Sequence, residues 1–342
     1  MEPPEFVQVI ISWYQINKRN LPWRTVKAPY FIWLSEILLQ QTRVNQGLPY
    51  YYKFVNEFDN ITSLAHADES KILRMWQGLG YYSRARNMHA TAKMIVDKYN
   101  GNFPNTYTEL LKLKGIGEYT AAAIASFAFE EKVAVVDGNV YRVLSRYFGV
   151  DTDILSSQGK KEFKILANSL LPNTNSSIYN QAIMEFGALQ CTPGMPNCDG
   201  CPLSFGCFAR STGKQKSLPV KAKKNSKKLR YFQYLVYYYN NQLLMKKREG
   251  NDIWKGMYQF PLVENAETTV HEPAEIYNIS PTVKHILSHQ IIEASFVRIE
   301  LPNQEKLNHF AQITGSEIVS IEESELLPKP VLINNYLKEN FF

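Results

Sequence analysis

The four cysteines of this 342-residue chain all fall in one short stretch, between Cys191 and Cys207. They run Cys191-x6-Cys198-x2-Cys201-x5-Cys207, so four thiolates can close around one soft metal centre. Two other interpretations stay open on spacing alone. One is a structural zinc site, whose usual form has two separated C-x2-C knuckles, and the other is four unrelated buried thiols. We predict a metal centre that constrains the fold around this stretch.

Residues 1 to about 210 are predicted to be mostly helical, because apolar residues recur three and four apart in segments such as 31–39 and 140–148. Seven lysines, one arginine and no acid follow between Lys214 and Arg230. Such a run is typical of an exposed, solvated linker. It predicts a domain boundary.

The last third of the chain is predicted to be a separate α+β domain. Residues 231–239 and 242–247 flank Asn240-Asn241, which indicates a β-hairpin. Residues 289–301 are also rich in strand-forming side chains. We find no internal repeat.

Composition sets only broad limits. A hydrophobic content of 45% and a charged content of 20% are those of an ordinary globular protein, and the net charge of +6 is compatible with a nucleic-acid partner without requiring one. No run of 18 or more apolar residues occurs, and the first residues lack the pattern of a signal peptide. We expect a cytoplasmic protein with no membrane partner, in which a reducing environment disfavours disulfides.

Two glycines precede an alanine-rich segment at residues 121–126. Gly115 and Gly117 permit a tight turn that directs backbone N–H groups, and the positive end of the next helix, at a phosphate. An ordinary helix–helix turn is the alternative. Further along, Asp137 follows four apolar residues and precedes a helix with an apolar stripe. A carboxylate at a helix N-terminus is often only a cap, but helix N–H groups also favour its ionised form.

Glu36 is the only charged residue between Lys27 and Arg43. A carboxyl group among apolar neighbours is desolvated, which raises its pKa and suits a general acid; a surface glutamate is the alternative. Hydrolysis of a glycosidic bond uses one protonated acid and one carboxylate in this way. Glu36 and Asp137 are therefore candidate catalytic residues.

The sequence resembles the adenine DNA glycosylase (MutY) family of the helix-hairpin-helix DNA glycosylase superfamily. The resemblance is carried by the 115–117 turn with Asp137, by the cysteine spacing, and by residues 21–24, 34–44, 78–86 and 180–188. It spans most of residues 20–207. It implies a mainly α helix-hairpin-helix region with a 4Fe-4S cluster loop at 1–212, made of a six-helix part at about 28–133 and a cluster part at 1–27 plus 134–212. A basic linker at 213–229 and an α+β Nudix-like domain at 230–342 would follow.

The resemblance also assigns roles by position. Glu36 would protonate adenine N7, and Asp137 would stabilise the sugar cation, assisted by Tyr119 and Asn139. Other positions match residues that bind the extruded adenine, that contact DNA, and that hold the cluster. These are Trp23, Arg24 and Gln181 for the base; Gln41, Tyr81, Gly115, Gly117, Ser288 and His289 for DNA; and Cys191, Cys198, Cys201 and Cys207 for the cluster.

The resemblance implies a monomeric, monofunctional enzyme that removes adenine opposite 8-oxoguanine or guanine in double-stranded DNA. Tyr119 stands where lyases of the superfamily carry a nucleophilic lysine, whereas Lys114 precedes the first glycine of the turn. Two alternatives are an endonuclease III-like lyase for oxidised pyrimidines and a non-catalytic iron-sulfur DNA-binding protein. In the C-terminal domain, Glu264, Glu267, Glu272 and Glu275 lack the spacing of a Nudix magnesium box, so we expect no pyrophosphatase activity.

Overall fold

The computed structural model describes residues 3–222, 226–265 and 276–342. Its contacts group residues 1–66 with 90–223 in a first unit, and residues 67–89 with 224–342 in a second. The division passes through helix α6 (Ser83–Tyr99). The boundaries proposed from the sequence, 1–212, 213–229 and 230–342, therefore stay a prediction.

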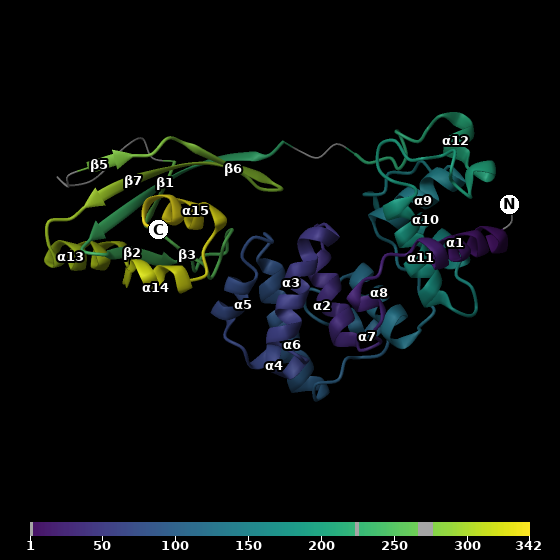
Figure 1. The fold of residues 1–342 in the computed structure, drawn as a ribbon, viewed down its shortest axis with the longest axis horizontal. Helices are drawn as coiled ribbons and strands as arrows, with labels where there is room; N and C mark the ends of the chain where they lie inside the picture. Colours follow the sequence, from purple (N-terminus) through teal and green to yellow (C-terminus); the bar gives the residue numbers. More distant parts are fainter. Residues whose placement is uncertain (1–2, 223–225, 266–275) are drawn as a thin grey trace. The chain divides into compact units, whose positions relative to one another are not determined.

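The first unit is helical throughout its described residues (Figure 1). Besides the second part of α6, it contains α1 (Pro3–Asn17), η1 (Pro22–Arg24), α2 (Pro29–Leu39), α3 (Val44–Glu57), α4 (Ile61–His66), α7 (Tyr107–Leu110), α8 (Glu118–Phe129), α9 (Gly138–Phe148), α10 (Ser157–Ser169), α11 (Ser176–Leu189), η2 (Ser204–Gly206) and α12 (Phe208–Thr212). The helices predicted at 31–39 and 140–148 are thus confirmed as α2 and α9.

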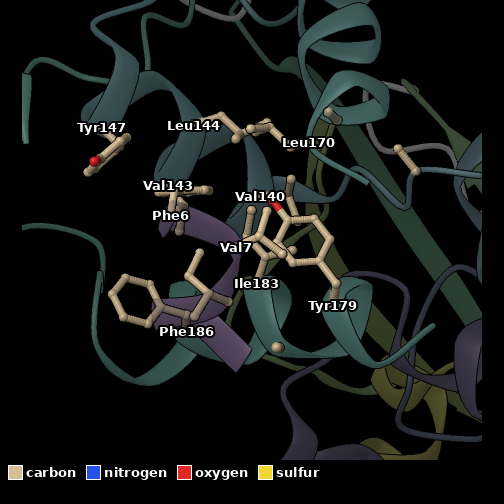
Figure 2. Close-up of a cluster of buried hydrophobic side chains, with 14 of the residues drawn as sticks. Phe6, Val7, Val140, Val143, Leu144, Tyr147, Leu170, Tyr179, Ile183 and Phe186 are labelled. Atoms are coloured by element: carbon tan, nitrogen blue, oxygen red, sulfur yellow. The ribbon is translucent and has the colours of Figure 1, made fainter. Parts of the chain in front are cut away.

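The helix α9 carries the apolar stripe that its sequence predicted. Val140, Val143, Leu144 and Tyr147 are all buried, and they face α1, α10 and α11 in one hydrophobic core (Figure 2). Burying each large apolar side chain contributes about 1.5–3 kcal/mol. Three of the cysteines pack against the edge of the same core. The core therefore fixes both the start of α9 and the cysteine loop.

The helix α2 is apolar on every side rather than on one stripe. Pro29 occupies its first turn, where the missing N–H costs nothing, and Trp33, Leu34 and Leu38 have no exposed surface. A helix that is hydrophobic all round is buried. Its burial is what places Glu36 in the interior.

The basic stretch after α12 is not wholly solvated, and in this respect the expectation from its composition was wrong. Leu218 is 3% exposed, and Arg146 donates a hydrogen bond of 3.1 Å to its carbonyl oxygen. The Ile154 amide donates to the Val220 carbonyl at 3.1 Å. The buried Leu218 side chain and these backbone hydrogen bonds hold residues 218–220 on the first unit, whereas residues 223–225 lie outside the described part of the chain.

The second unit is built on a mixed β-sheet, in which β3, β2, β1, β7 and β5 lie in that order (Figure 1). Strands β4, β6 and β8 pair with β1, β7 and β2, and only β1 and β7 run parallel among the pairs described. Its elements are α5 (Glu69–Met75), the start of α6, β1 (Lys228–Tyr239), β2 (Gln242–Lys247), β3 (Tyr258–Gln259), β4 (Leu262–Glu264), β5 (Ile276–Ile279), β6 (Val283–Ile286), β7 (Gln290–Glu300), α13 (Gln304–Thr314), β8 (Glu317–Ser320), α14 (Ile321–Leu326) and α15 (Val331–Asn340).

Helices cover both faces of this sheet. Consecutive residues of a strand point to opposite faces, and on β7 Phe296 stacks on Tyr336 of α15, whereas Val297 belongs to a core that includes Phe310 of α13. The predicted hairpin is confirmed: β1 and β2 are antiparallel, and Asn240 and Asn241 both have positive φ, as a tight two-residue turn requires. The predicted α+β class of this part is confirmed.

Two further observations bear on predictions about function. Of the scattered glutamates, Glu264 forms an ion pair of 2.6 Å with Arg230, and Glu267, Glu272 and Glu275 lie outside the described residues. None of the helices formed by the described residues combines the length and the apolar character that crossing a lipid bilayer requires.

Candidate active site and cysteine cluster

Glu36 lies on the buried helix α2 and is only 7% exposed. The hydroxyl of Tyr119 hydrogen bonds to its carboxyl group. Its pKa is raised to about 7, mainly because burial removes the hydration of the charged form and in smaller part because Asp137 is also negative. Glu36 can thus hold a proton near neutral pH, as the sequence predicted.

Asp137 caps the N-terminus of α9. Its carboxylate accepts hydrogen bonds of 2.8 Å from the backbone amides of Asn139 and Val140 and one of 2.7 Å from the Asn139 side chain. These bonds and the charge of Arg142 lower its pKa, but burial has the larger effect, so the pKa lies above its usual value. The helix N–H groups were predicted to favour the ionised form, and they do, but burial opposes them and has the larger effect.

Tyr119 hydrogen bonds to Glu36 and lies close enough to Asp137 to be affected by its charge. It is the second residue of α8, and burial followed by the charges of Glu36 and Asp137 raises the pKa of its hydroxyl well above the usual value. The hydroxyl therefore stays protonated and donates to Glu36. Three helices, α2, α8 and α9, thus bring one cluster of groups together.

A cavity of about 330 Å³ opens beside Glu36. Trp23, Arg24 and Gln181, the three predicted base-binding residues, all line it together with Glu36. The Gln181 carbonyl oxygen accepts a hydrogen bond of 3.0 Å from Tyr14, so its amide group remains as the donor. The walls of the cavity therefore combine a carboxyl group of raised pKa with an aromatic ring and with hydrogen-bonding side chains.

The two predicted glycines form the turn between α7 and α8. Gly115 has a φ of +76°, a conformation that side chains rarely adopt, and Gly117 is the residue that immediately precedes α8. A side chain at Gly117 would meet open space, and the first amides of a helix have no partner within it. A phosphate contact at this turn stays a prediction.

The remaining predicted DNA contacts lie in different units. Gln41 is exposed in the first unit at a φ of +57°, and Tyr81 is 41% exposed in the second at a φ of +47°. Such backbone conformations are uncommon outside glycine and occur often at functional sites. In the second unit, Tyr81, Ser288 and His289 line one cavity of about 560 Å³, and the Ser288 hydroxyl lies 3.0 Å from Nδ1 of His289.

The cysteines are free thiols that surround one small cavity of about 30 Å³. Their mutual charges raise the pKa values of Cys201 and Cys207, after the larger effect of burial. Within residues 3–222, 226–265 and 276–342, no group of three or more His, Cys, Asp or Glu side chains is arranged to hold a single metal ion. Cys191, Cys198, Cys201 and Cys207 nevertheless all line this one cavity.

Comparison with known proteins identifies the family. The chain matches the HhH-GPD superfamily of base excision DNA repair proteins over residues 34–170 and a NUDIX domain over residues 233–339. It is 41% identical over 261 residues to an adenine DNA glycosylase of Buchnera aphidicola subsp. Baizongia pistaciae, covering 75% of this chain and 73% of that one. An adenine DNA glycosylase of Buchnera aphidicola subsp. Acyrthosiphon pisum is 34% identical over 304 residues, 87% of each chain. The chain belongs to the adenine DNA glycosylase family.

A solved structure supports the fold of this adenine DNA glycosylase family member. A thermostable thymine-DNA glycosylase superimposes with a TM-score of 0.58 at 30% identity, over 61% of this chain and 97% of that one. The predicted helix-hairpin-helix class of the N-terminal part is confirmed.

Glu185 of the adenine DNA glycosylase fold was missed by sequence reasoning. It is 1% exposed and forms ion pairs of 2.6 Å with Arg19 and 2.7 Å with Arg24. These arginines outweigh the effect of its burial and lower its pKa to about 2. The only feature that points to Glu185 is an acid within the otherwise apolar segment 182–188.

Arg142 is a second residue that sequence reasoning missed. It is 8% exposed and donates to the side-chain oxygen of Asn139 at 2.8 Å and to the carbonyl oxygens of Gly187 at 2.6 Å and Cys191 at 2.7 Å. A side chain at Gly187 would lie 2.7 Å from Cβ of Asn139, so only glycine permits this approach of α11 to α9. The cysteine loop and the Asp137 cap thus share one hydrogen-bonded support.

Proposed function

We propose that this adenine DNA glycosylase family member hydrolyses the N-glycosidic bond of adenine that lies opposite 8-oxoguanine, and secondarily opposite guanine, in duplex DNA. The observation that carries the proposal is the pair of carboxyl groups, which share one site but differ in their hydrogen bonds. Glu36 receives one hydroxyl, whereas Asp137 receives three N–H groups. A single proton shared by the pair therefore resides on Glu36.

In the proposed reaction, Glu36 donates its proton to N7 of adenine while the bond between the base and C1′ breaks. Positive charge develops on the deoxyribose, and the Asp137 carboxylate stabilises it from the N-terminus of α9. Water then adds to C1′, which leaves an abasic site. Tyr119 orients the Glu36 carboxyl group, and Asn139 holds Asp137 in its ionised form.

The cavity beside Glu36 is the proposed adenine pocket. Adenine must leave the base stack to reach it, which costs a few kcal/mol. Trp23 would pack on the base, and the Gln181 amide would donate to a ring nitrogen. Because Glu185 holds Arg24 in a bidentate pair, Arg24 is fixed at the cavity wall without rotating freely.

The DNA around the pocket would be held by groups that the geometry makes accessible. The amides of the 115–117 turn suit a phosphate, since they lie at the positive end of α8. Gln41 and Tyr81, both exposed and at positive φ, would enter the duplex and fill the space that the extruded base leaves.

A lyase reaction requires an amine that attacks C1′. Tyr119 occupies the position from which such a lysine would act, and its hydroxyl instead donates a hydrogen bond to Glu36. We therefore propose a monofunctional hydrolase and not an endonuclease III-like lyase.

The cysteines would hold a 4Fe-4S cluster. A single zinc ion needs all four sulfurs at about 2.3 Å from one point, whereas a cluster accepts wider spacing. When bound, the cluster would supply a structural cross-link, with four iron–thiolate bonds closing residues 191–207. In the protein, Arg142 and Arg146 connect this loop to the interior, and an Arg146 nitrogen lies 3.4 Å from the Cys191 sulfur.

The second unit would read the base opposite adenine. Ser288 and His289 form the turn between β6 and β7, and both carry groups that can hydrogen bond to a purine. Leu287, before them, would contribute only apolar contact. A pyrophosphatase reaction is not proposed, because Glu264 is engaged by Arg230.

The decisive experiment is single-turnover cleavage of a duplex with adenine opposite 8-oxoguanine, compared with duplexes that contain adenine opposite thymine or a damaged pyrimidine. We expect adenine release from the first duplex, no release from the matched pair, and no covalent adduct on borohydride treatment. Undiminished release by Glu36→Gln or Asp137→Asn would contradict the proposed mechanism.

A further inference from the structure

The loop between β2 and β3 carries a strained aromatic residue. Trp254 has a φ of +59°, although its side chain is large and only 7% exposed. A bulky residue in this conformation is strained and persists only where its surroundings fix it. Contacts with the rest of the unit, and not the intrinsic backbone preference of Trp254, must therefore hold the loop in this conformation.

Two arginines hold the loop in place through hydrogen bonds to the residues before Trp254. The Asp252 carboxylate accepts hydrogen bonds of 2.8 Å from Arg230 and 2.8 Å from Arg248, and Arg248 also donates to the Ile253 carbonyl at 3.0 Å. Arg230, which is 8% exposed, also pairs with Glu264. These charged groups anchor the residues immediately before Trp254.

The indole ring of Trp254 lies against one residue of β1 and one residue of β6, the strand that leads into the 287–289 turn. It lies edge-on to Phe232 of β1, with ring centroids 6.3 Å apart, and against His285 of β6, at 5.7 Å. Burial lowers the pKa of His285, which favours its neutral form. The contact between Trp254 and His285 is an edge-on packing contact between two rings.

His285 stands three residues before Ser288 on the same hairpin. It pairs with Ile292 of β7, and the Leu287 amide donates to the Gln290 carbonyl at 2.9 Å to close the turn. Trp254, His285, Ser288 and His289 all line the cavity of about 560 Å³ in the second unit. A shift of the His285 ring would thus move the turn that carries Ser288 and His289.

We propose that Trp254 and His285 are positioning residues for recognition of the base opposite adenine: the strained Trp254 ring supports His285, which sets the position of the 287–289 turn. The inference rests on the proposed reading role of that turn. It adds two residues that do not themselves touch DNA but fix the groups that do. Their removal should therefore weaken the discrimination between two duplexes more than it weakens catalysis.

The test compares Trp254→Leu with Phe310→Leu. Phe310 is also 7% exposed, belongs to the same unit and stacks on Tyr237, but it does not line the cavity. For each variant, dissociation constants are measured for two duplexes that carry an uncleavable abasic analogue opposite 8-oxoguanine or guanine. Trp254→Leu should reduce the ratio of these constants at least about tenfold, and Phe310→Leu less than twofold.

A second pair of variants keeps the inference testable if Trp254→Leu fails to fold. His285→Phe retains a ring against Trp254, whereas His285→Ala removes it, so the first should keep most of the preference and the second should lose it. An unchanged ratio in His285→Ala, or equal losses in both His285 variants, would overturn the inference. If the wild-type protein itself shows no preference for 8-oxoguanine, the proposed reading function fails; if it shows one that Ser288→Ala abolishes and Trp254→Leu does not, only the present inference fails.

Discussion

Replacing Glu36 by glutamine should make the protein more stable at alkaline pH while removing its activity. The carboxyl group has a pKa of about 7 in the folded protein, against an ordinary value of 4.5 in the unfolded chain. Below pH 4.5 the group is protonated in both states and contributes no penalty. As the pH rises towards 7, only the unfolded state loses its proton, so the folded protein is progressively destabilised.

The size of the effect follows from the two pKa values. Each tenfold difference in a protonation equilibrium corresponds to about 1.4 kcal/mol, so the full penalty is about 3 kcal/mol, most of which falls between pH 5 and pH 8.5. Glutamine cannot ionise and does not carry this penalty. The difference in unfolding free energy between Glu36→Gln and the wild type should therefore grow by about 2–3 kcal/mol over that range, in favour of the variant.

Urea unfolding at a series of pH values measures this difference. Glu118→Gln is the matched control, because Glu118 is exposed on α8 and its 3.3 Å ion pair with Lys164 is open to solvent. Its difference from the wild type should stay nearly constant with pH. A constant difference for Glu36→Gln as well would refute the claim that burial sets the protonation of this group.

Three further predictions concern the site. For the wild type, the single-turnover rate on adenine opposite 8-oxoguanine should be level between the pH at which Asp137 takes up a proton and pH 7, and should fall tenfold per pH unit above pH 7, because Glu36 must be protonated; a rate that rises through pH 7 would exclude Glu36 as the proton donor. Glu185→Gln should lower the free energy of unfolding by about 3–5 kcal/mol, since it leaves Arg19 and Arg24 without their buried partner, and a urea titration would detect the loss. Arg142→Met should reduce both the cleavage rate and the iron content of purified protein, whereas Arg298→Met, at a residue that packs on Tyr238 in the second unit, should leave both near wild type.

The sequence predicted those parts of the site that depend on local pattern. Asp137 follows an apolar stretch and precedes a helix, so a cap was expected and is present. The all-round apolar character of α2 predicted the burial of Glu36. The Asn240-Asn241 turn depends on two neighbouring residues alone. In each case the decisive interaction lies within a few positions along the chain.

The parts that were missed depend on contacts between distant segments. Glu185 meets Arg19 across 166 positions, and Arg142 meets Cys191 across 49. No local pattern distinguishes a buried arginine that supports a loop from one on a helix surface. The pKa of Asp137 was missed for the same reason: its helix bonds are local, but the burial that outweighs them comes from other helices.

The two carboxyl groups depend on different parts of the fold, and this separation makes their roles distinguishable. Arg142 affects the pKa of Asp137 and supports its hydrogen-bond partner Asn139, but it is not among the groups that set the pKa of Glu36. Burial in α2 sets that pKa, with smaller effects of the Tyr119 hydroxyl and of the charges of Asp137 and Arg24. As long as Asp137 stays ionised, disturbing the cysteine loop through Arg142 should therefore lower the level part of the pH–rate profile without moving the pH at which the rate begins to fall. A shift of that pH would mean that the disturbance also changes the charge of Asp137 and reaches the proton donor through it.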